Sequence, residues 1–164
     1  MEFYDLNQGA QSKLANLSTR GVVGTGSNVI VAGFILGGSP EIGTDRIVAR
    51  GIGPSLTSLG LAGALPDPTL ELRSQNGTIL ISDDNWQDDP AQALILTETG
   101  LAPTHPLESA IVADLPTTSY TVILAGLHQS TGIGLVEVYD NPAGGPTPTP
   151  GPPSMVSAPT FKQR

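Results

Sequence analysis

The chain has no cysteine, few charged residues and few aromatic residues. Without cysteine, none of its 164 residues can form a disulfide, a thiolate zinc site or a thiol nucleophile. Charged residues make up 13% of the sequence, which is low for a cytosolic domain. Glycine, threonine, serine and proline take their place, as is typical of all-β secreted proteins with many turns. The composition therefore favours an extracellular or cell-surface location.

Positive charge is also scarce. Seven lysines and arginines stand against fifteen acidic residues, for a net charge of −8. Phosphate binding requires clustered basic residues, and here they are scattered singly, so we expect no nucleic-acid partner. No apolar run reaches the roughly 18 residues that cross a bilayer, so we expect no membrane span.

Short runs rich in valine, isoleucine and threonine alternate with turn signals along residues 14–140. The clearest turn is Asn76-Gly77, which separates two alternating runs and is typical of a β-hairpin. The predicted strands lie at 14–18, 28–36, 46–50, 69–73, 78–82, 109–115, 119–126 and 133–139. Their number and spacing predict an all-β fold, a jelly-roll-like β-sandwich of about eight strands.

One or two short helices are also expected. Asp89 can cap a helix that has Pro90 in its first position and ends at Gly100. Its predicted stripe is Ala91, Leu94, Ile95 and Glu98. A shorter helical turn is predicted at 55–61, and we expect both helices to cover an open end of the sandwich.

Composition divides the chain into a sandwich domain and extended arms. The segments are an N-terminal arm at 1–13, the domain at 14–140, a linker at 141–154 and a tail at 155–164. Alternating proline and threonine predict an extended polyproline form for the linker. The composition of the tail favours disorder. The apolar residues Met155, Val156 and Phe161 instead predict contact with another subunit.

The opening residues repeat the sequence of the last predicted strand. Glu2, Phe3, Tyr4 and Asp5 follow the pattern of residues 137–140, and an apolar residue precedes each copy. Because a strand presents alternate residues to opposite faces, both copies put the same side chains on the same face. The opening segment is thus a candidate strand for donation to a neighbouring copy. The alternatives are the end of a preceding tandem repeat and a chance match.

The densest chemical cluster is the acidic loop at 83–89. Its carboxylates and amides are oxygen ligands of the kind that Ca²⁺ prefers, although their spacing is not that of an EF-hand. The candidate calcium ligands are Asp83, Asp84, Asp88 and Asp89. The alternative is a solvated turn in which Asp89 caps a helix. Trp86, the only tryptophan, either stacks on a sugar or anchors the loop to the sandwich, and we favour the anchor.

No catalytic motif is recognisable. His105 and His128 both lie in turn-like contexts, and the sequence contains neither Gly-x-Ser-x-Gly nor His-Glu-x-x-His. We therefore expect a protein that is not an enzyme.

Ordered motifs over residues 1–140 carry a resemblance to a known kind of domain. They are LANLSTRG at 14–21, VAGFI at 31–35, IGPSL at 52–56, DPTLEL at 67–72, DNW at 84–86, GLAP at 100–103, ESAI at 108–111, YT at 120–121 and VEVYD at 136–140. In these the chain resembles a repeat β-sandwich domain of large exported or surface proteins of environmental bacteria. It is also distantly similar to the C-terminal β-sandwich of secreted bacterial peptidases. The resemblance implies no known activity. In tandem copies the last strand runs directly into the next LAN start, which makes residues 2–5 look like a borrowed final strand.

These patterns predict a non-catalytic extracellular structural module. We expect it to assemble with copies of itself through terminal strands, into a filament or a tandem surface array, because a donated strand satisfies an exposed sheet edge. The expected assembly residues are Glu2, Phe3, Tyr4, Asp5, Met155, Val156 and Phe161. The alternative is a carbohydrate-binding or adhesive accessory module with a surface polysaccharide as partner. Aromatic side chains lined up on an exposed sheet face would favour that alternative.

Overall fold

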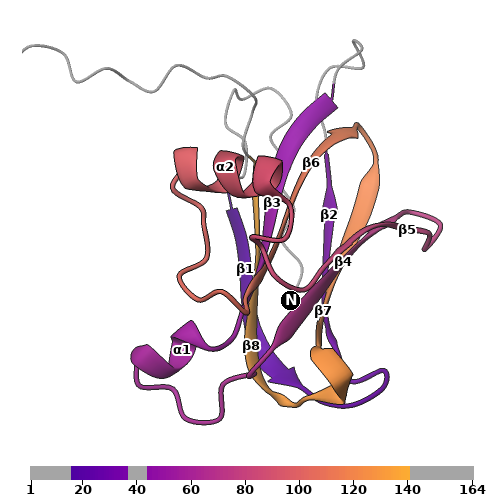
Figure 1. Ribbon diagram of the computed structural model, residues 1–164. Coiled ribbons are helices and arrows are strands. Elements are labelled where there is room, and N and C mark those ends of the chain that lie inside the picture. Colours follow the sequence, from indigo (N-terminus) through magenta and orange to yellow (C-terminus); the bar gives the residue numbers. More distant parts are fainter. Residues whose placement is uncertain (1–15, 37–43, 141–164) are drawn as a thin grey trace, which may run out of the picture.

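Strands form where valine, isoleucine and leucine alternate with polar residues, and they stack as two antiparallel layers (Figure 1). The computed structural model describes residues 16–36 and 44–140. One layer, sheet A, contains in order β1 (Asn16–Val23), β8 (Gly132–Asp140), β3 (Thr44–Ile52) and β6 (Ser109–Pro116). The other, sheet B, contains β2 (Ile30–Ile35), β7 (Ser119–Gly126), β4 (Pro68–Ser74) and β5 (Ile79–Asp83).

The strands pair as nested partners from opposite ends of the chain. β1 pairs with β8, β2 with β7, β3 with β6, and β4 with β5, all antiparallel. This nesting is the jelly-roll arrangement of two four-stranded sheets. The predicted all-β sandwich is therefore confirmed, with eight strands in the described residues.

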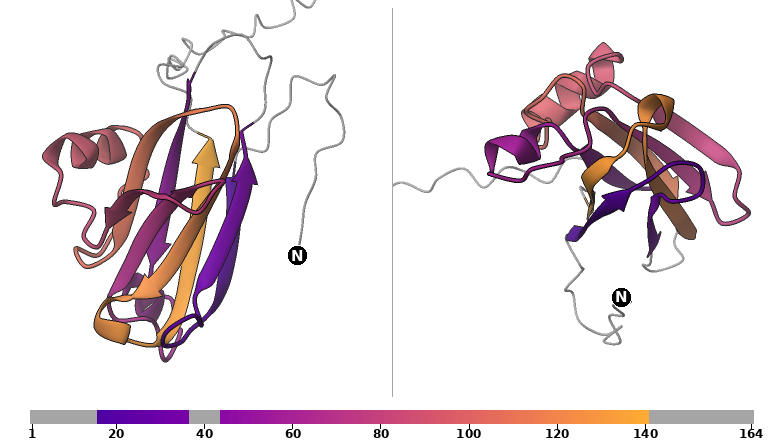
Figure 2. Two further views of the ribbon diagram at one scale, coloured as in Figure 1. Left: turned by 90° about the vertical axis from the view of Figure 1, so that its right-hand side faces the viewer. Right: turned by 90° about the horizontal axis from the view of Figure 1, so that it is seen from below.

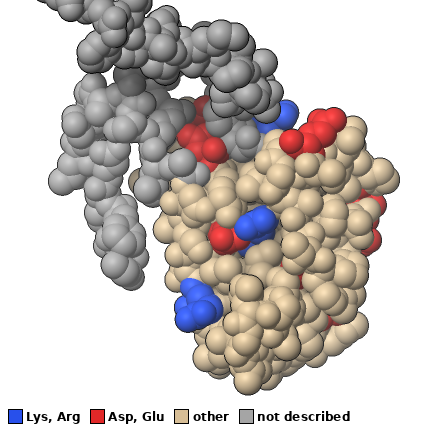
Figure 3. Space-filling model, turned by 90° about the vertical axis from the view of Figure 1, so that its left-hand side faces the viewer, with Lys and Arg blue, Asp and Glu red and all other residues tan. Residues whose placement is uncertain are grey.

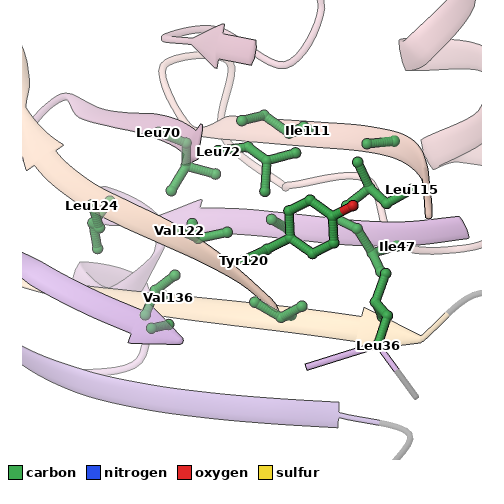
Figure 4. Packing of buried hydrophobic residues seen from close by; sticks show 14 of the residues in the cluster. Leu36, Ile47, Leu70, Leu72, Ile111, Leu115, Tyr120, Val122, Leu124 and Val136 are labelled. Carbon is green, nitrogen blue, oxygen red and sulfur yellow. The ribbon is translucent and has the colours of Figure 1, made fainter. Parts of the chain in front are cut away.

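The main core lies between the sheets and is built from the inward residues of every strand (Figure 4). Leu70 and Leu72 of β4 are fully buried, as are Val122 and Leu124 of β7. At the end of the sandwich where β7 begins, Tyr120 stacks on a phenylalanine of β2 and donates a hydrogen bond to the carbonyl of the last β6 residue, at 2.9 Å. Burial of each large apolar side chain contributes roughly 1.5–3 kcal/mol.

A second, smaller core lies on the outer face of sheet A. Leu96 of α2 (Pro90–Glu98) packs there against Val48 and Ala110. The structure corrects two expectations. α2 covers this outer face rather than an end of the sandwich (Figure 2), and the buried residue is Leu96, whereas Leu94 is exposed. The other helix, α1 (Ser55–Ser58), is one turn long.

The described body begins and ends on neighbouring strands. Asn16, the first residue of β1, pairs with Tyr139 near the end of β8. Both chain ends therefore leave sheet A at the same end of the sandwich. The arm at 1–13, the linker at 141–154 and the tail at 155–164 lie outside the described residues. Among the residues that are described, no helix is long and apolar enough to cross a membrane.

Candidate functional site

The glutamate and the tyrosine of the Glu-x-Tyr pattern make specific side-chain contacts in β8. Glu137 and Tyr139 lie on the outer face of sheet A beside Arg50 of β3. The Arg50 Nε donates to Glu137 Oε2 at 2.9 Å, and Nη2 donates to the same oxygen and to the Tyr139 hydroxyl at 3.0 Å. The Arg50 guanidinium also lies 5.1 Å from the centre of the Tyr139 ring. Both residues of the pattern thus engage one arginine of the adjacent strand.

This cluster is shielded from water. The Arg50 and Glu137 side chains are 19% and 12% exposed, so their attraction is screened less than that of a surface pair. Arg50 Nη1 donates to the Leu101 carbonyl at 3.2 Å, which ties the loop after α2 to the sheet. Desolvation raises the pKa of Tyr139, and the positive charge of Arg50 opposes that rise.

The inward side chains of β8 are also well packed. Val136 is fully buried and Val138 nearly so, and β8 hydrogen-bonds to β1 on one side and β3 on the other. The position that a copy of this strand would take within a single domain is therefore already occupied by the chain itself.

The outer edge of β6 is covered by side chains at Ala110 and Val112. The Gln92 carboxamide of α2 donates to the Ala110 carbonyl at 2.8 Å and accepts from the Val112 N–H at 2.8 Å. A carboxylate oxygen of Asp83 accepts from the Ala110 N–H at 2.8 Å. These contacts imitate a neighbouring strand, and covering an edge in this way prevents unwanted pairing.

The opposite edge of sheet A, β1, is open. Within residues 16–36 and 44–140, β1 pairs with β8 alone. Its outward residues include Ser18, Arg20 and Val22, all exposed. Thr19 lies at an inward-facing position of β1, where a core residue is expected, but it is also exposed. No carboxylate of the described residues forms an ion pair with Arg20.

The edge strand of the facing sheet also leaves apolar side chains exposed. On β2, the edge strand of the facing sheet, Val31 is 57% and Ile35 73% exposed. The inward residues Leu17, Ile30 and Phe34 pack against the core but stay only partly buried. The sandwich is thus less completely covered on its β1–β2 side.

The carboxylates of the acidic loop have different structural roles. Asp89 caps α2 by accepting from the Ala91 N–H at 2.9 Å, as predicted, while Asp88 accepts from the Asn85 amide at 3.4 Å. Burial, together with the negative charges of its neighbours, raises the pKa of Asp83 to about 6. One of those neighbours is Asp84; burial, and after it the charge of Asp84, also raises the pKa of Asp67. In the described part of the chain, no three acidic or histidine side chains converge as a metal site would require.

Trp86 is an anchor of this loop, as we favoured. It packs against the second core, and its indole Nε1 donates to the His105 carbonyl at 3.2 Å. The other described aromatic residues are Phe34, Tyr120 and Tyr139, and each is at least partly buried. The described residues therefore offer no row of exposed aromatic rings.

Sequence reasoning missed the buried carboxylate of Glu108. It is fully buried and accepts from the backbone N–H groups of Gly53 at 3.0 Å, Ser55 at 2.9 Å and His105 at 3.3 Å. The Ser55 hydroxyl donates to it at 2.5 Å. The only signal was a glutamate just before an apolar strand. With four donors satisfied, Glu108 locks two loops together and is a structural group.

An open groove of about 460 Å³ lies between the β4–β5 and β6–β7 hairpins. Its walls include Leu80, Leu115 and Pro116, and polar groups of the two turns form its rim. The Thr118 hydroxyl donates to the Gln75 amide oxygen at 3.2 Å and so joins the two hairpins.

Charged side chains are few on the surface in general, and Figure 3 shows a face on which wide uncharged areas separate them.

No protein-family model matches the chain, and comparison with curated proteins finds no similar sequence. Residues 2–5, Met155, Val156 and Phe161, which the sequence predicts to mediate assembly, lie outside the described residues.

Proposed function

We propose that this chain is a non-catalytic structural module of an extracellular or cell-surface assembly, which associates with copies of itself through its terminal strands. The observation that carries the proposal is that the two edges of sheet A differ in how far side chains cover them. Side chains of Gln92 and Asp83 cover the β6 edge at Ala110 and Val112, whereas the β1 edge stays open among the described residues. An open edge is a template for pairing with another chain.

The positions of the chain ends support the same proposal. Residues 1–15 precede β1 in the sequence, so the second copy of the β8 sequence is joined to the strand that forms the open edge. The linker leaves from the adjacent strand. In polyproline form its fourteen residues, 141–154, reach about 40 Å, which exceeds the roughly 30 Å covered by nine-residue β8. A spacer of this length is long enough to connect the tail with a neighbouring body.

Deletion of residues 1–7 tests the proposal. The truncated chain should stay folded, since every described strand remains, but it should lose the long assemblies of the full chain. Light scattering after size-exclusion chromatography, with electron microscopy of the same fractions, measures both. A matched control replaces residues 2–5 with glycine and serine, which keeps the length of the arm. Assembly by the truncated protein equal to that of the full chain contradicts the proposal, as does a full chain that stays monomeric at every concentration.

The alternative function is a carbohydrate-binding or adhesive accessory module. It is favoured by the groove between the hairpins, whose lining combines apolar side chains with hydroxyl and amide groups, as that of many ligand sites does. The absence of exposed aromatic rings among the described residues counts against it. Titration calorimetry with surface polysaccharides tests this alternative, and loss of binding on substitution of Asn76 or Thr118 would support it.

We further propose calcium as a ligand of the acidic loop. The supporting observation is that Asp84, Asp88 and Asp89 lie close enough to Asp83 for their negative charges to raise its pKa, in addition to the effect of burial. Binding to the native state raises the melting temperature. A melt that is identical with calcium and with chelator rules out binding at the concentration used.

A further inference from the structure

We propose that the acceptor for residues 2–5 of a second copy is the free edge of β1. There they add to sheet A as a ninth, antiparallel strand, with Glu2 opposite Arg20. This inference rests on the proposed function, self-association through terminal strands, and names the surface that receives the strand. It differs from simple replacement of β8, which the likeness between the two sequences first suggests.

Replacement of β8 is disfavoured by how β8 is held. Its departure would break its pairing with both β1 and β3 and expose Val136 and Val138. In a donated strand Phe3 takes the place of Val138, whose cross-strand neighbours are Leu17 and Ala49. A phenylalanine overpacks a nearly closed valine site. Addition at a free edge breaks no native contact.

Charge distinguishes β1 from the other open edges. The donated segment carries Glu2 and Asp5. β2 has no charged residue, and β5 ends at Asp83 beside further acidic residues that would repel the segment. β1 carries Arg20, a cation with no carboxylate partner among the described residues. Opposite charges on facing residues of paired strands attract, whereas like charges repel.

The way in which β1 pairs with β8 supports β1 as the acceptor, and the opposition of Glu2 to Arg20 sets the register. Its other edge already binds the matching sequence of β8, antiparallel, with Glu137 and Tyr139 outward. With Glu2 opposite Arg20, an antiparallel strand places Phe3 opposite Thr19 and Tyr4 opposite Ser18. Phe3 then points inward, toward the partly buried side chains of the β1–β2 side, and fills the space beside exposed Thr19.

Disulfide trapping tests the register directly, and the cysteine-free chain needs no background substitution. Tyr4→Cys in one copy is mixed with Ser18→Cys in another, and the mixture is oxidised mildly. Facing residues of paired strands have Cβ atoms about 4.5–5.5 Å apart, and a small movement of the strands brings them to the roughly 3.5–4.5 Å that a disulfide requires. Controls pair Tyr4→Cys with Val31→Cys on β2 and with Ser82→Cys on β5, both exposed positions on the outer face of sheet B.

We expect the Ser18 pair to give covalent dimers at least about tenfold faster than either control pair. Equal or faster trapping by Val31→Cys or Ser82→Cys overturns the β1 acceptor. To test the arm of the same copy as occupant, both cysteines are placed in one chain. A trapped monomer, with no ladder of covalent oligomers, means that the arm covers its own β1, and the proposed second copy is then wrong.

A charge swap supplies an independent readout. Arg20→Glu should raise the concentration needed for half-maximal assembly about five- to tenfold, because a weak attraction of the exposed pair becomes a repulsion. Adding Glu2→Arg should restore assembly. Circular dichroism verifies that each variant is folded. If assembly persists but neither variant changes it, the β1 edge is excluded while the proposed function stands. If the unsubstituted chain does not assemble, the proposed function itself fails.

Discussion

Asp83→Asn should stabilise the protein at neutral pH. The wild-type carboxylate sits partly buried among acidic neighbours, and burial raises its pKa from 3.8 to about 6. Its one described hydrogen bond is accepted from the Ala110 N–H, at 2.8 Å. An asparagine carbonyl oxygen accepts the same bond and carries no charge. The substitution therefore removes the cost of burying the charge and keeps the contact that closes the β6 edge.

The pKa values set the size and sign of the effect. Between pH 3.8 and about 6 the folded protein holds the Asp83 proton more tightly than the unfolded chain does. Stability therefore falls as pH rises through this window and levels off above it. A shift of about two units corresponds to roughly 3 kcal/mol at most. Because the side chain is partly exposed, solvent screening reduces the expected gain for Asp83→Asn at pH 7 to about 1–2 kcal/mol.

Urea unfolding of both proteins between pH 4 and pH 8 measures this gain. The two stabilities should converge near pH 4 and separate by pH 7. Asp88→Asn is the control: this exposed residue lies in the same loop, and its substitution should change stability by less than about 0.5 kcal/mol. A variant that is no more stable than wild type at pH 7, with the same pH dependence, would refute the reasoning. Calcium must be absent, since a bound cation would stabilise the wild-type carboxylate.

Three further substitutions test the packing around the sheets. Trp86→Ala should cost about 3 kcal/mol in urea unfolding, as a large truncation in the second core; a loss below about 1 kcal/mol together with lost polysaccharide binding would favour the carbohydrate function. Glu108→Ala should cost about 3 kcal/mol or prevent folding, because it leaves four donors unpaired, one of them buried and three partly buried; wild-type stability would contradict its role. Gln92→Ala should cost about 1–2 kcal/mol and increase light scattering, because it uncovers the β6 edge; unchanged scattering would show that another group protects the edge.

Local sequence signals predicted the elements whose geometry is local. The Asn76-Gly77 turn forms with Gly77 at φ 84°, a conformation that glycine adopts without strain, and it sets the β4–β5 hairpin. Asp89 and Pro90 begin α2 as expected. Strand ends were less predictable. The arginines at 46 and 50 suggested a short strand, but β3 runs from Thr44 to Ile52 because its backbone pairs with β6 and β8 over that length.

Features that depend on distant residues escaped prediction. The periodicity of α2 indicated Leu94 as a core residue, but in the folded protein Gln92 bonds to β6 and Leu96 is buried instead. The four donors of Glu108 come from segments as far as 55 residues away. Likewise, closure of the β6 edge by a glutamine side chain has no sequence signature, and the difference between the two edges of sheet A appears only in three dimensions.

The two copies of the strand sequence differ in a way that fits two different positions in a sheet. Glutamate and tyrosine recur in both, and in β8 these point outward, where Arg50 binds them. The inward residue between them changes from Val138 to Phe3. Valine suits a central strand, where Leu17 and Ala49 flank it closely. Phenylalanine suits a strand at the edge, beside the exposed Thr19 and the partly covered core. The segment at 2–5 is therefore better matched to the edge of β1 than to the position of β8, which is what assembly by strand addition requires.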